Sequence, residues 1–472
     1  MIVQQFFVKG LAHSSYLLGG ANTCAIVDPR RDVDVYIDAA RDMGMKITHI
    51  LETHLHADFV SGHLELTGRT GAVIYAPKSA KCAFKHIAVK QGDVFEMEDM
   101  RIKVLETPGH TPEHISYVVT DSARGKEPVC VFCGDTLFVG DVGRPDLFPG
   151  KAKELANKLY HSLHSKLLKL PDFCEVYPAH GAGSLCGRAM GAKRTSTIGY
   201  ERRYNAALQI KNKAQFIKSL TTNMPAAPDH FSRCSAINAK GPALTNRIPE
   251  MIAVNAGTFA KMAKQKNSVT LDIRSYEAFG GQHVPGSYHI DFGGNFVTFA
   301  GWILPPGNNI LIVADSFDQA KQASVWLKRV GLDRAAAYLD GEMFAWAAAG
   351  LPTDHVEQLS VDRLYAMATQ GDGLMLLDVR APREYEQVHI DGAANIPVAD
   401  LRTRFKELDK GRPVALMCST GHRSSLGASL LQQRGFRKVY NVAGGMTGYS
   451  AAGYAKQCPM CVAPHISSFM GK

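Results

Sequence analysis

The sequence predicts a mixed α/β protein in which an α+β domain is followed by two α/β domains of one kind. The chain has 472 residues, which is more than one hydrophobic core usually accommodates. In the first half, short apolar runs typical of strands end in histidine or aspartate, next to glycine or proline that permits a turn. Further on, a strand pattern ending in Asp-x-Arg occurs twice, at Asp272 and Asp378, 106 residues apart.

These patterns predict four segments. We expect the α+β domain over residues 1–225 and a linker with the first α/β domain over 226–354. The second α/β domain follows over 355–457, and a tail occupies 458–472. The tail holds Cys458 and Cys461 as a C-x-x-C pair, which is half of a zinc site, a redox pair or a segment without function.

Composition excludes several classes of partner. The net charge is +9, from 53 basic and 44 acidic residues. The basic residues are scattered, so we expect no nucleic-acid partner and favour a small anionic substrate instead. No apolar run approaches the roughly 20 residues of a membrane helix, so we expect no membrane partner. Without a recognisable signal peptide, we expect a cytoplasmic protein whose ten cysteines are reduced thiols.

Residue types that bind metals follow four of the predicted strands. Segment 53–58 reads Thr-His-Leu-His-Ala-Asp, and imidazole with carboxylate suits a divalent transition metal. On an extended chain His54 and His56 would share one face, because side chains repeat every two residues. The other strand ends present a histidine or an aspartate, at His110, Asp135 and His180.

The four motifs HxHxD, PGHT, GDTLF and PAHG, in that order, resemble those of the metallo-β-lactamase superfamily over roughly the first 220 residues. The resemblance implies an αββα sandwich with the metal at one edge of its two sheets. Members with two zinc ions have HxHxDH, whereas Phe59 follows Asp58 here. Because a phenyl ring cannot bind a metal, this departure favours a single metal ion.

Persulfide dioxygenases are the mononuclear iron group of that superfamily. The resemblance implies one Fe(II) per chain, held by His54, His110 and Asp135. Two histidines and one carboxylate form the facial triad of non-haem iron oxygenases, which leaves three positions for a sulfur anion and O₂. The other motif residues would orient these ligands or bind water; they are His56, Asp58 and His180.

Further residues of this region have a functional and a structural interpretation. Segment 141–146 resembles the one after the aspartate ligand of persulfide dioxygenases, so Arg144 would bind a substrate carboxylate; a structural ion pair is the equal alternative. Segment 180–187 resembles a loop of persulfide dioxygenases fused to rhodaneses, so Cys186 would carry sulfur unless it is a buried structural thiol. Cys130 and Cys133 lie in a strand pattern, and we expect them in the core.

The two repeated α/β domains resemble rhodanese domains. In the second, a strand ends at Cys418, and a C-x4-R loop leads into a helix. Loop N–H groups, the helix N-terminus and Arg423 would favour a thiolate. This ring is one residue shorter than the C-x5-R loop of protein phosphatases, which favours sulfur transfer at Cys418. The first domain has Asp315 in the corresponding loop and no cysteine, so we expect it to be catalytically silent.

The whole chain resembles the bacterial persulfide dioxygenase–rhodanese fusions of sulfide detoxification. The resemblance implies oxidation of a small thiol persulfide by O₂ to sulfite, and thiosulfate formation at Cys418 by sulfurtransferase activity. We expect a homo-oligomer, a dimer or tetramer. Two rivals stay open: a zinc thioesterase of the glyoxalase II kind joined to a sulfurtransferase, and a non-enzymatic sulfur carrier or sensor.

Overall fold

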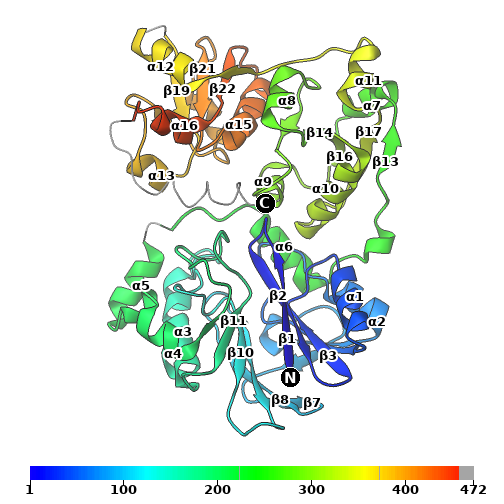
Figure 1. The fold of residues 1–472 in the computed structure, drawn as a ribbon, viewed down its shortest axis with the longest axis vertical. Helices are drawn as coiled ribbons and strands as arrows, with labels where there is room; N and C mark the ends of the chain where they lie inside the picture. The colour runs from blue at the N-terminus through cyan, green and yellow to red at the C-terminus, as the bar shows by residue number, and fades with distance from the viewer. Residues whose placement is uncertain (223, 371–372, 456–472) are drawn as a thin grey trace. The chain divides into compact units, whose positions relative to one another are not determined.

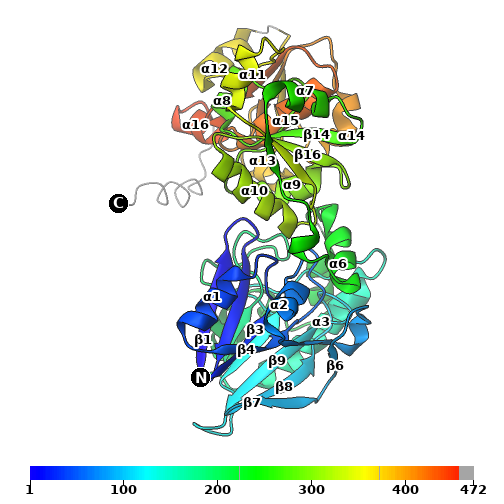
Figure 2. The same cartoon turned by 90° about the vertical axis from the view of Figure 1, so that its right-hand side faces the viewer.

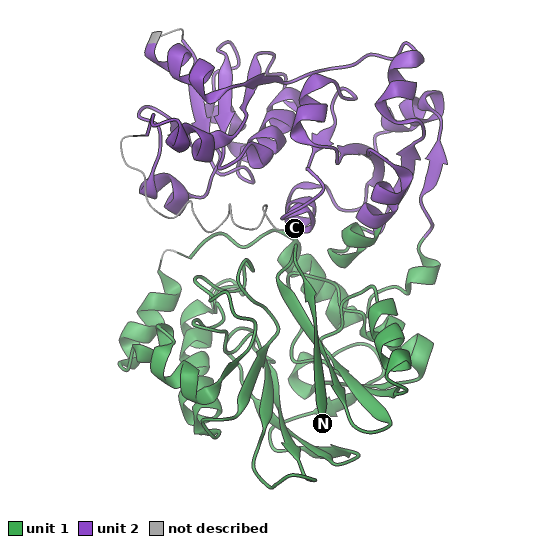
Figure 3. Ribbon diagram, viewed as in Figure 1, with its two compact units in different colours: residues 1–248, 325–332 green, residues 249–324, 333–472 purple. Residues whose placement is uncertain are grey.

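A computed structural model describes residues 1–222, 224–370 and 373–455. The chain divides into two compact units, residues 1–248 with 325–332, and residues 249–324 with 333–472 (Figure 3). In the described part of the chain, no helix has the length and apolar character needed to cross a membrane. The predicted tail pair, Cys458 and Cys461, lies outside the described residues.

Unit 1 contains two six-stranded sheets. The strands of the first, in spatial order, are β1 (Ile2–Val8), β2 (His13–Gly19), β3 (Thr23–Val27), β4 (Lys46–Leu51), β5 (Val73–Pro77) and β6 (Ile87–Val89). Those of the second are β12 (Ser196–Thr197), β11 (Glu175–Pro178), β10 (Cys130–Gly134), β9 (Ile115–Asp121), β8 (Met100–Glu106) and β7 (Val94–Met97). Figure 2 shows β7, β8 and β9 side by side, paired antiparallel.

Helices cover the outer face of each sheet. The helices of unit 1 are α1 (Asp34–Asp42), α2 (His63–Thr70), α3 (Ala152–Ser165), α4 (Ile198–Tyr204), α5 (Lys213–Thr221) and α6 (His230–Lys240). Figure 1 shows α1 and α2 on one outer side and α3, α4 and α5 on the other. This is the predicted αββα sandwich.

Three apolar layers hold the sandwich together. Side chains such as Tyr16 and Phe132 meet between the two sheets. Tyr36 of α1 belongs to the layer under the first sheet, and Leu159 of α3 to the layer under the second. Each buried side chain of this size contributes about 1.5–3 kcal/mol to folding. The predicted core cysteines are confirmed as buried, with Cys130 in the central layer and Cys133 under the second sheet.

The segment predicted as a linker after residue 225 is instead part of unit 1. Residues 226–248 cluster with the sandwich and contain α6. Asn238 of α6 accepts a hydrogen bond from the Ser61 amide and donates to the carbonyls of His56 and Phe59. These three bonds fix the loop after β4, which explains why the segment stays with the first domain.

Unit 2 contains two five-stranded parallel sheets with the same strand order. The first is ordered β13 (Ile252–Val254), β17 (Ala335–Leu339), β16 (Asn309–Val313), β14 (Ser268–Asp272) and β15 (Tyr288–His289). The second is ordered β18 (Glu357–Leu359), β22 (Val439–Val442), β21 (Val414–Met417), β19 (Met375–Asp378) and β20 (Ala394–Asn395). The identical order confirms the repeated domain.

The helices between these strands also correspond. Those of the first domain are α7 (Ala256–Ala263), α8 (Tyr276–Gly281), α9 (Phe296–Ile303), α10 (Phe317–Arg329) and α11 (Glu342–Ala348); residues 325–329 of α10 cluster with unit 1. Those of the second are α12 (Val361–Gln370), α13 (Pro382–Gln387), α14 (Leu401–Arg404), α15 (His422–Gln433) and α16 (Gly445–Ala451). In both repeats the arginine of Asp-x-Arg bonds its own aspartate, in Arg274–Asp272 and Arg380–Asp378.

Candidate metal centre and sulfur-transfer loop

The structure brings His54, His110 and Asp135 together from three strand ends. Their loops follow β4, β8 and β10, and one ligand atom of each lies within 4.8 Å of the others. His110 Nε2 is 3.3 Å and His54 Nε2 is 3.8 Å from Asp135 Oδ2. Bonds of about 2.1 Å to a divalent metal place neighbouring ligand atoms about 3–3.5 Å apart. The geometry is therefore close to that of a metal site.

Hydrogen bonds set the tautomer of both histidines. The Thr53 hydroxyl donates to Asp28 Oδ2, so it accepts the Nδ1–H of His54. The carbonyl of Arg144 accepts the Nδ1–H of His110. Each ring therefore presents an unprotonated Nε2, and both Nε2 atoms are buried without a hydrogen-bond partner among the described residues. Two free imidazole lone pairs beside a buried carboxylate fit a divalent transition metal.

His180 bridges the two aspartates of the region. Its Nδ1 donates to Asp135, at 2.8 Å, and its Nε2 donates to Asp58, also at 2.8 Å. Burial opposes the charged ring, but the two carboxylates raise the pKa of His180 well above its usual range. With both nitrogens protonated, His180 links Asp135 to Asp58.

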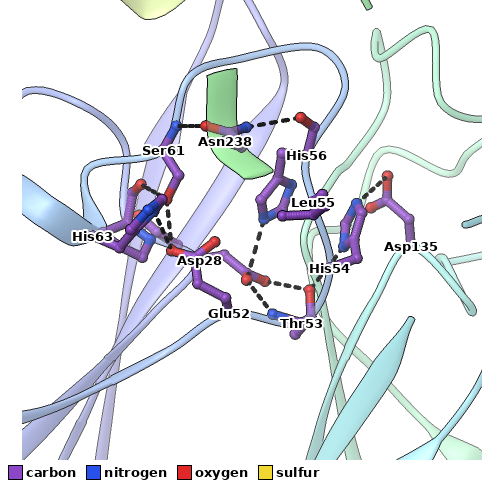
Figure 4. Close-up of polar contacts among 12 residues, drawn as sticks. Asp28, Glu52, Thr53, His54, Leu55, His56, Ser61, His63, Asp135 and Asn238 are labelled. Atoms are coloured by element: carbon purple, nitrogen blue, oxygen red, sulfur yellow. Dashed lines mark hydrogen bonds and ion pairs between the residues drawn. The ribbon is translucent and has the colours of Figure 1, made fainter. Parts of the chain in front are cut away.

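The His54 and His56 rings are neighbours, with centroids 4.1 Å apart, but their nitrogens have different partners. Strand β4 ends at Leu51, so segment 53–58 is a loop and not the extended chain considered for the sequence. In Figure 4 His54 points to Asp135 whereas His56 points to Asp28. His56 Nε2 lies 3.1 Å from Asp28 Oδ1. Burial opposes the charged ring, yet Asp28 raises the pKa of His56. His56 is thus linked to Asp28, which also accepts the hydroxyl hydrogen of Thr53.

Phe59 fills the space where the two-metal pattern has a ligand. Its side chain is fully buried, and its ring centroid lies 4.0 Å from that of His13 and 4.5 Å from that of His56. Asp58, next to it, points to His180 rather than to a free ligand position. A further triple of possible ligand atoms comprises Asp58, His180 and Cys186, but its histidine has both nitrogens engaged.

Arg144 and Cys186 are both in structural surroundings. The Arg144 side chain is 1% exposed, and it bonds both oxygens of Asp146 and the carbonyls of Leu185 and Pro225. This favours the structural ion pair over a substrate contact, because the guanidinium donors are already engaged. Burial, with Asp58 and Asp135 nearby, raises the pKa of the Cys186 thiol well above its usual value, which favours an unreactive thiol.

Sequence reasoning missed three residues that support the ligands. The His114 ring stacks on that of His54, with centroids 4.7 Å apart, and its Nε2 accepts the amide hydrogen of Asp135. Glu113 accepts the amide hydrogen of Leu55. Asp28 accepts from both the amide and the hydroxyl of Thr53. The one available signal was the pair Glu113 and His114, which follows PGHT after a single proline.

Cys418 lies at the end of β21, before the N-terminus of α15. It is 1% exposed. The Gly421 amide donates to its sulfur at 3.1 Å and the Ser424 hydroxyl at 3.3 Å. Two hydrogen-bond donors and the positive end of a helix therefore converge on this sulfur.

Arg423 makes its hydrogen bonds to Glu384 and Ser419 rather than to the Cys418 sulfur. Its guanidinium bonds both oxygens of Glu384, at 2.6 and 2.7 Å, and the Ser419 hydroxyl at 2.8 Å. Although burial opposes ionisation, Arg423 lowers the pKa of Glu384 to about 2. Burial also opposes the charged guanidinium, whereas Glu384 and then Cys418 raise the pKa of Arg423. Arg423 therefore shapes the loop through Ser419 and stays within electrostatic reach of Cys418.

Comparisons with known proteins agree with this architecture. The profile of the metallo-beta-lactamase superfamily matches residues 8–180, and that of the rhodanese-like domain matches residues 255–349 and 360–452. A metallo-beta-lactamase structure from Staphylococcus aureus is 35% identical with a TM-score of 0.65, covering 71% of this chain and 98% of that one. The chain therefore belongs to the metallo-beta-lactamase superfamily and contains two rhodanese-like domains.

Two kinds of curated protein are similar to the first half of the chain. Hydroxyacylglutathione hydrolase of Pseudomonas entomophila is 30% identical over 217 residues, 46% of this chain and 80% of that protein. The mitochondrial persulfide dioxygenase ETHE1 of Mus musculus is 28% identical over 233 residues, 48% of this chain and 83% of that protein. The relatives of the first half of the chain thus include enzymes that catalyse different reactions.

Proposed function

We propose that the sandwich domain oxidises a small thiol persulfide with O₂ and that the second rhodanese-like domain converts the resulting sulfite to thiosulfate. The observation that carries this proposal is the buried triple of His54, His110 and Asp135, in which both histidines offer a free Nε2. Phe59 supports one metal rather than two, and similarity to a persulfide dioxygenase supports Fe(II).

The first reaction balances as R–S–SH + O₂ + H₂O giving R–SH, sulfite and two protons. Fe(II) held by the triple would bind the persulfide sulfur and activate O₂. Thr53 and the Arg144 carbonyl keep the two histidines in the tautomer that binds metal. His180 keeps Asp135 oriented and ionised through its Nδ1–H, which lies 2.8 and 3.0 Å from the two carboxylate oxygens. Phe59 excludes water and a second metal ion from the adjacent position.

The second reaction takes place at the Cys418 sulfur. A persulfide transfers its outer sulfur to the thiolate, giving Cys418–S–S⁻ and a free thiol. Sulfite then attacks the outer sulfur, which forms the S–S bond of thiosulfate and releases the Cys418 thiolate. The Gly421 amide and the Ser424 hydroxyl hold the anionic sulfur in both states. A single chain with both sites raises the effective concentration of sulfite for the second step.

A zinc thioesterase is the second candidate, favoured by the similarity to hydroxyacylglutathione hydrolase. It would cleave a glutathione thioester without consuming O₂. The two candidates differ in product as well as in metal, because only the oxidation releases sulfite.

Product analysis with two variants tests the proposal. With glutathione persulfide and O₂, we expect Cys418→Ser to accumulate sulfite without thiosulfate, because only the transfer step is removed. His54→Ala should form neither product. Thiosulfate from Cys418→Ser would contradict the assignment of the transfer step, and sulfite from His54→Ala would contradict the metal site. Accumulation of sulfite by Cys418→Ser would also exclude a sulfur carrier that has no enzymatic activity.

A further inference from the structure

The first rhodanese-like domain lacks a cysteine in its own loop, yet two of its residues lie against the Cys418 loop of the second. Both domains belong to unit 2. Tyr276 is the first residue of α8, and Asp291 follows β15. Their contacts involve Gly421 and His422, the residues between the Cys418 sulfur and helix α15.

Asp291 binds the first residue of α15. Its Oδ2 accepts a hydrogen bond from His422 Nδ1 at 2.9 Å. The hydrogen bond raises the pKa of His422, and Glu277, also in the first domain, adds to the effect. An imidazolium at this point is held to the silent domain by an ion pair. His422 directly follows Gly421, whose amide donates to the Cys418 sulfur.

Tyr276 lies over the same turn. Its ring is so close to Gly421 that a β-carbon there would lie 3.0–3.4 Å from three ring atoms. The ring also meets that of His422 edge-on, with centroids 5.2 Å apart. Burial raises the pKa of the Tyr276 phenol to about 12, whereas a hydrogen bond from the Gly444 backbone acts against this. Gly444 precedes α16, whose Met446 amide donates to the Cys418 carbonyl. Tyr276 therefore touches both segments that form the loop.

Other bonds fix the silent domain beside the active one. The His289 amide donates to the Ser429 hydroxyl in the middle of α15. Arg402 of α14 donates to the carbonyl of Trp302 in α9. The two domains are therefore joined by hydrogen bonds other than the Asp291–His422 pair.

We propose that Tyr276 and Asp291 are positioning residues of the Cys418 site, so that the silent domain holds the loop in the shape that sulfur transfer needs. The inference rests on the proposed sulfur transfer at Cys418. Asp291 fixes the end of α15 through His422, and Tyr276 covers Gly421 and Gly444. The silent domain thereby supports sulfur transfer in its neighbour, although its own loop has no nucleophile.

Two measurements on the full-length protein test this role. The first is sulfur transfer from thiosulfate to cyanide; the second is the rate at which iodoacetamide alkylates Cys418, followed by mass spectrometry of its peptide. Asp291→Asn should lower kcat about threefold to tenfold, the effect of one ordinary hydrogen bond, with little change in the KM for thiosulfate. Asp291→Glu should recover part of this loss.

Tyr276→Ala should lower kcat and should raise the alkylation rate of Cys418 by about tenfold, because the ring no longer covers the turn. A tenfold change in rate corresponds to about 1.4 kcal/mol. Tyr276→Phe, which keeps the ring, should recover part of the activity. The matched control is Asp318→Asn, an exposed aspartate of the same domain that pairs with Lys321. Equal effects in the control, or unchanged kcat and alkylation in Asp291→Asn and Tyr276→Ala, would overturn the inference.

Failure of the proposed sulfur transfer can be distinguished from failure of the positioning role. If the wild-type protein forms no thiocyanate, or if Cys418→Ser still does, sulfur transfer at Cys418 is wrong. Alkylation of Cys418 needs no sulfur transfer, so it still measures whether the silent domain controls the loop.

Discussion

At the scale of single residues, the metal site depends on which nitrogen of each histidine has the proton. Thr53 has one hydroxyl hydrogen, and it donates this hydrogen to the Asp28 carboxylate. This single constraint makes His54 donate through Nδ1 and frees Nε2. The HxHxD motif predicts the histidines, but it gives no sign of Asp28, which lies 25 residues earlier and is brought near only by the pairing of β3 with β4.

Asp28→Asn tests this constraint. An amide in place of the carboxylate offers a donor as well as an acceptor, so the Thr53 hydroxyl no longer has to accept from His54. We expect the iron affinity, measured by competition with a chelator, to fall about 10–100-fold, as for other groups that orient a ligand. Asp34→Asn, at an exposed aspartate that pairs with Arg69, should leave the affinity unchanged. An unchanged affinity in Asp28→Asn would show that Thr53 does not set the tautomer.

Phe59→His tests why one metal is expected. The new imidazole would stand beside Asp58, which pairs with His180, and would complete the two-metal pattern. We expect the zinc content of the reconstituted protein, measured by mass spectrometry, to rise from one to two ions per chain, whereas Phe59→Leu keeps one. Two zinc ions in the wild-type protein would contradict the interpretation of Phe59.

At the scale of elements, the candidate metal ligands and Cys418 all lie in loops that directly follow strands. The order of strands and the ends that present His54, His110, Asp135 and Cys418 could be predicted, because turn residues and apolar runs mark each boundary. The direction of side chains in these loops could not be predicted. His56 pairs with Asp28 and Arg423 with Glu384 of α13, and only the fold brings these partners close.

Gly445→Ala tests the packing of the Cys418 loop. Gly445 has a φ of +51°, and a β-carbon there would lie 2.3 Å from the Cys418 carbonyl oxygen. We expect a loss of more than about 2 kcal/mol of stability in the second rhodanese-like domain, with loss of sulfur transfer. Gly453→Ala is the matched control, since its φ is +78° but no atom lies within 4 Å of the added carbon; it should cost only about 1–2 kcal/mol. Equal losses in both variants would exclude the steric contact as the cause.

The Arg423–Glu384 pair predicts a pH dependence. The pKa of Glu384 is lowered to about 2 from a usual 4.5. A lowered folded-state pKa stabilises the domain above about pH 4.5, and this contribution is lost as the pH falls toward about 2. Hydrogen exchange of α15 should therefore be faster in Glu384→Gln than in the wild type at neutral pH, and the difference should shrink at about pH 3. Glu407→Gln, which removes an exposed pair with Arg404, should have little effect. A difference as large at about pH 3 as at neutral pH would contradict this origin.

At the scale of the whole molecule, the repeat could be predicted from the recurring Asp-x-Arg pattern, whereas the order of strands within each sheet came only from the structure. The expectation that the first copy is catalytically silent rests on the absence of a cysteine from its loop around Asp315. Its contacts with the second copy could not be predicted, because Tyr276 and Asp291 are separated from Gly421 and His422 by more than a hundred residues. Such contacts depend on how two finished domains pack, which no local pattern encodes.

The central claim is that the sandwich domain is an iron oxygenase and not a zinc hydrolase. The most direct measurement is oxygen uptake by anaerobically purified protein of known iron content, with glutathione persulfide as substrate. The account predicts one iron per chain and one O₂ consumed per sulfite formed. Zinc in place of iron, with no oxygen uptake, would contradict it.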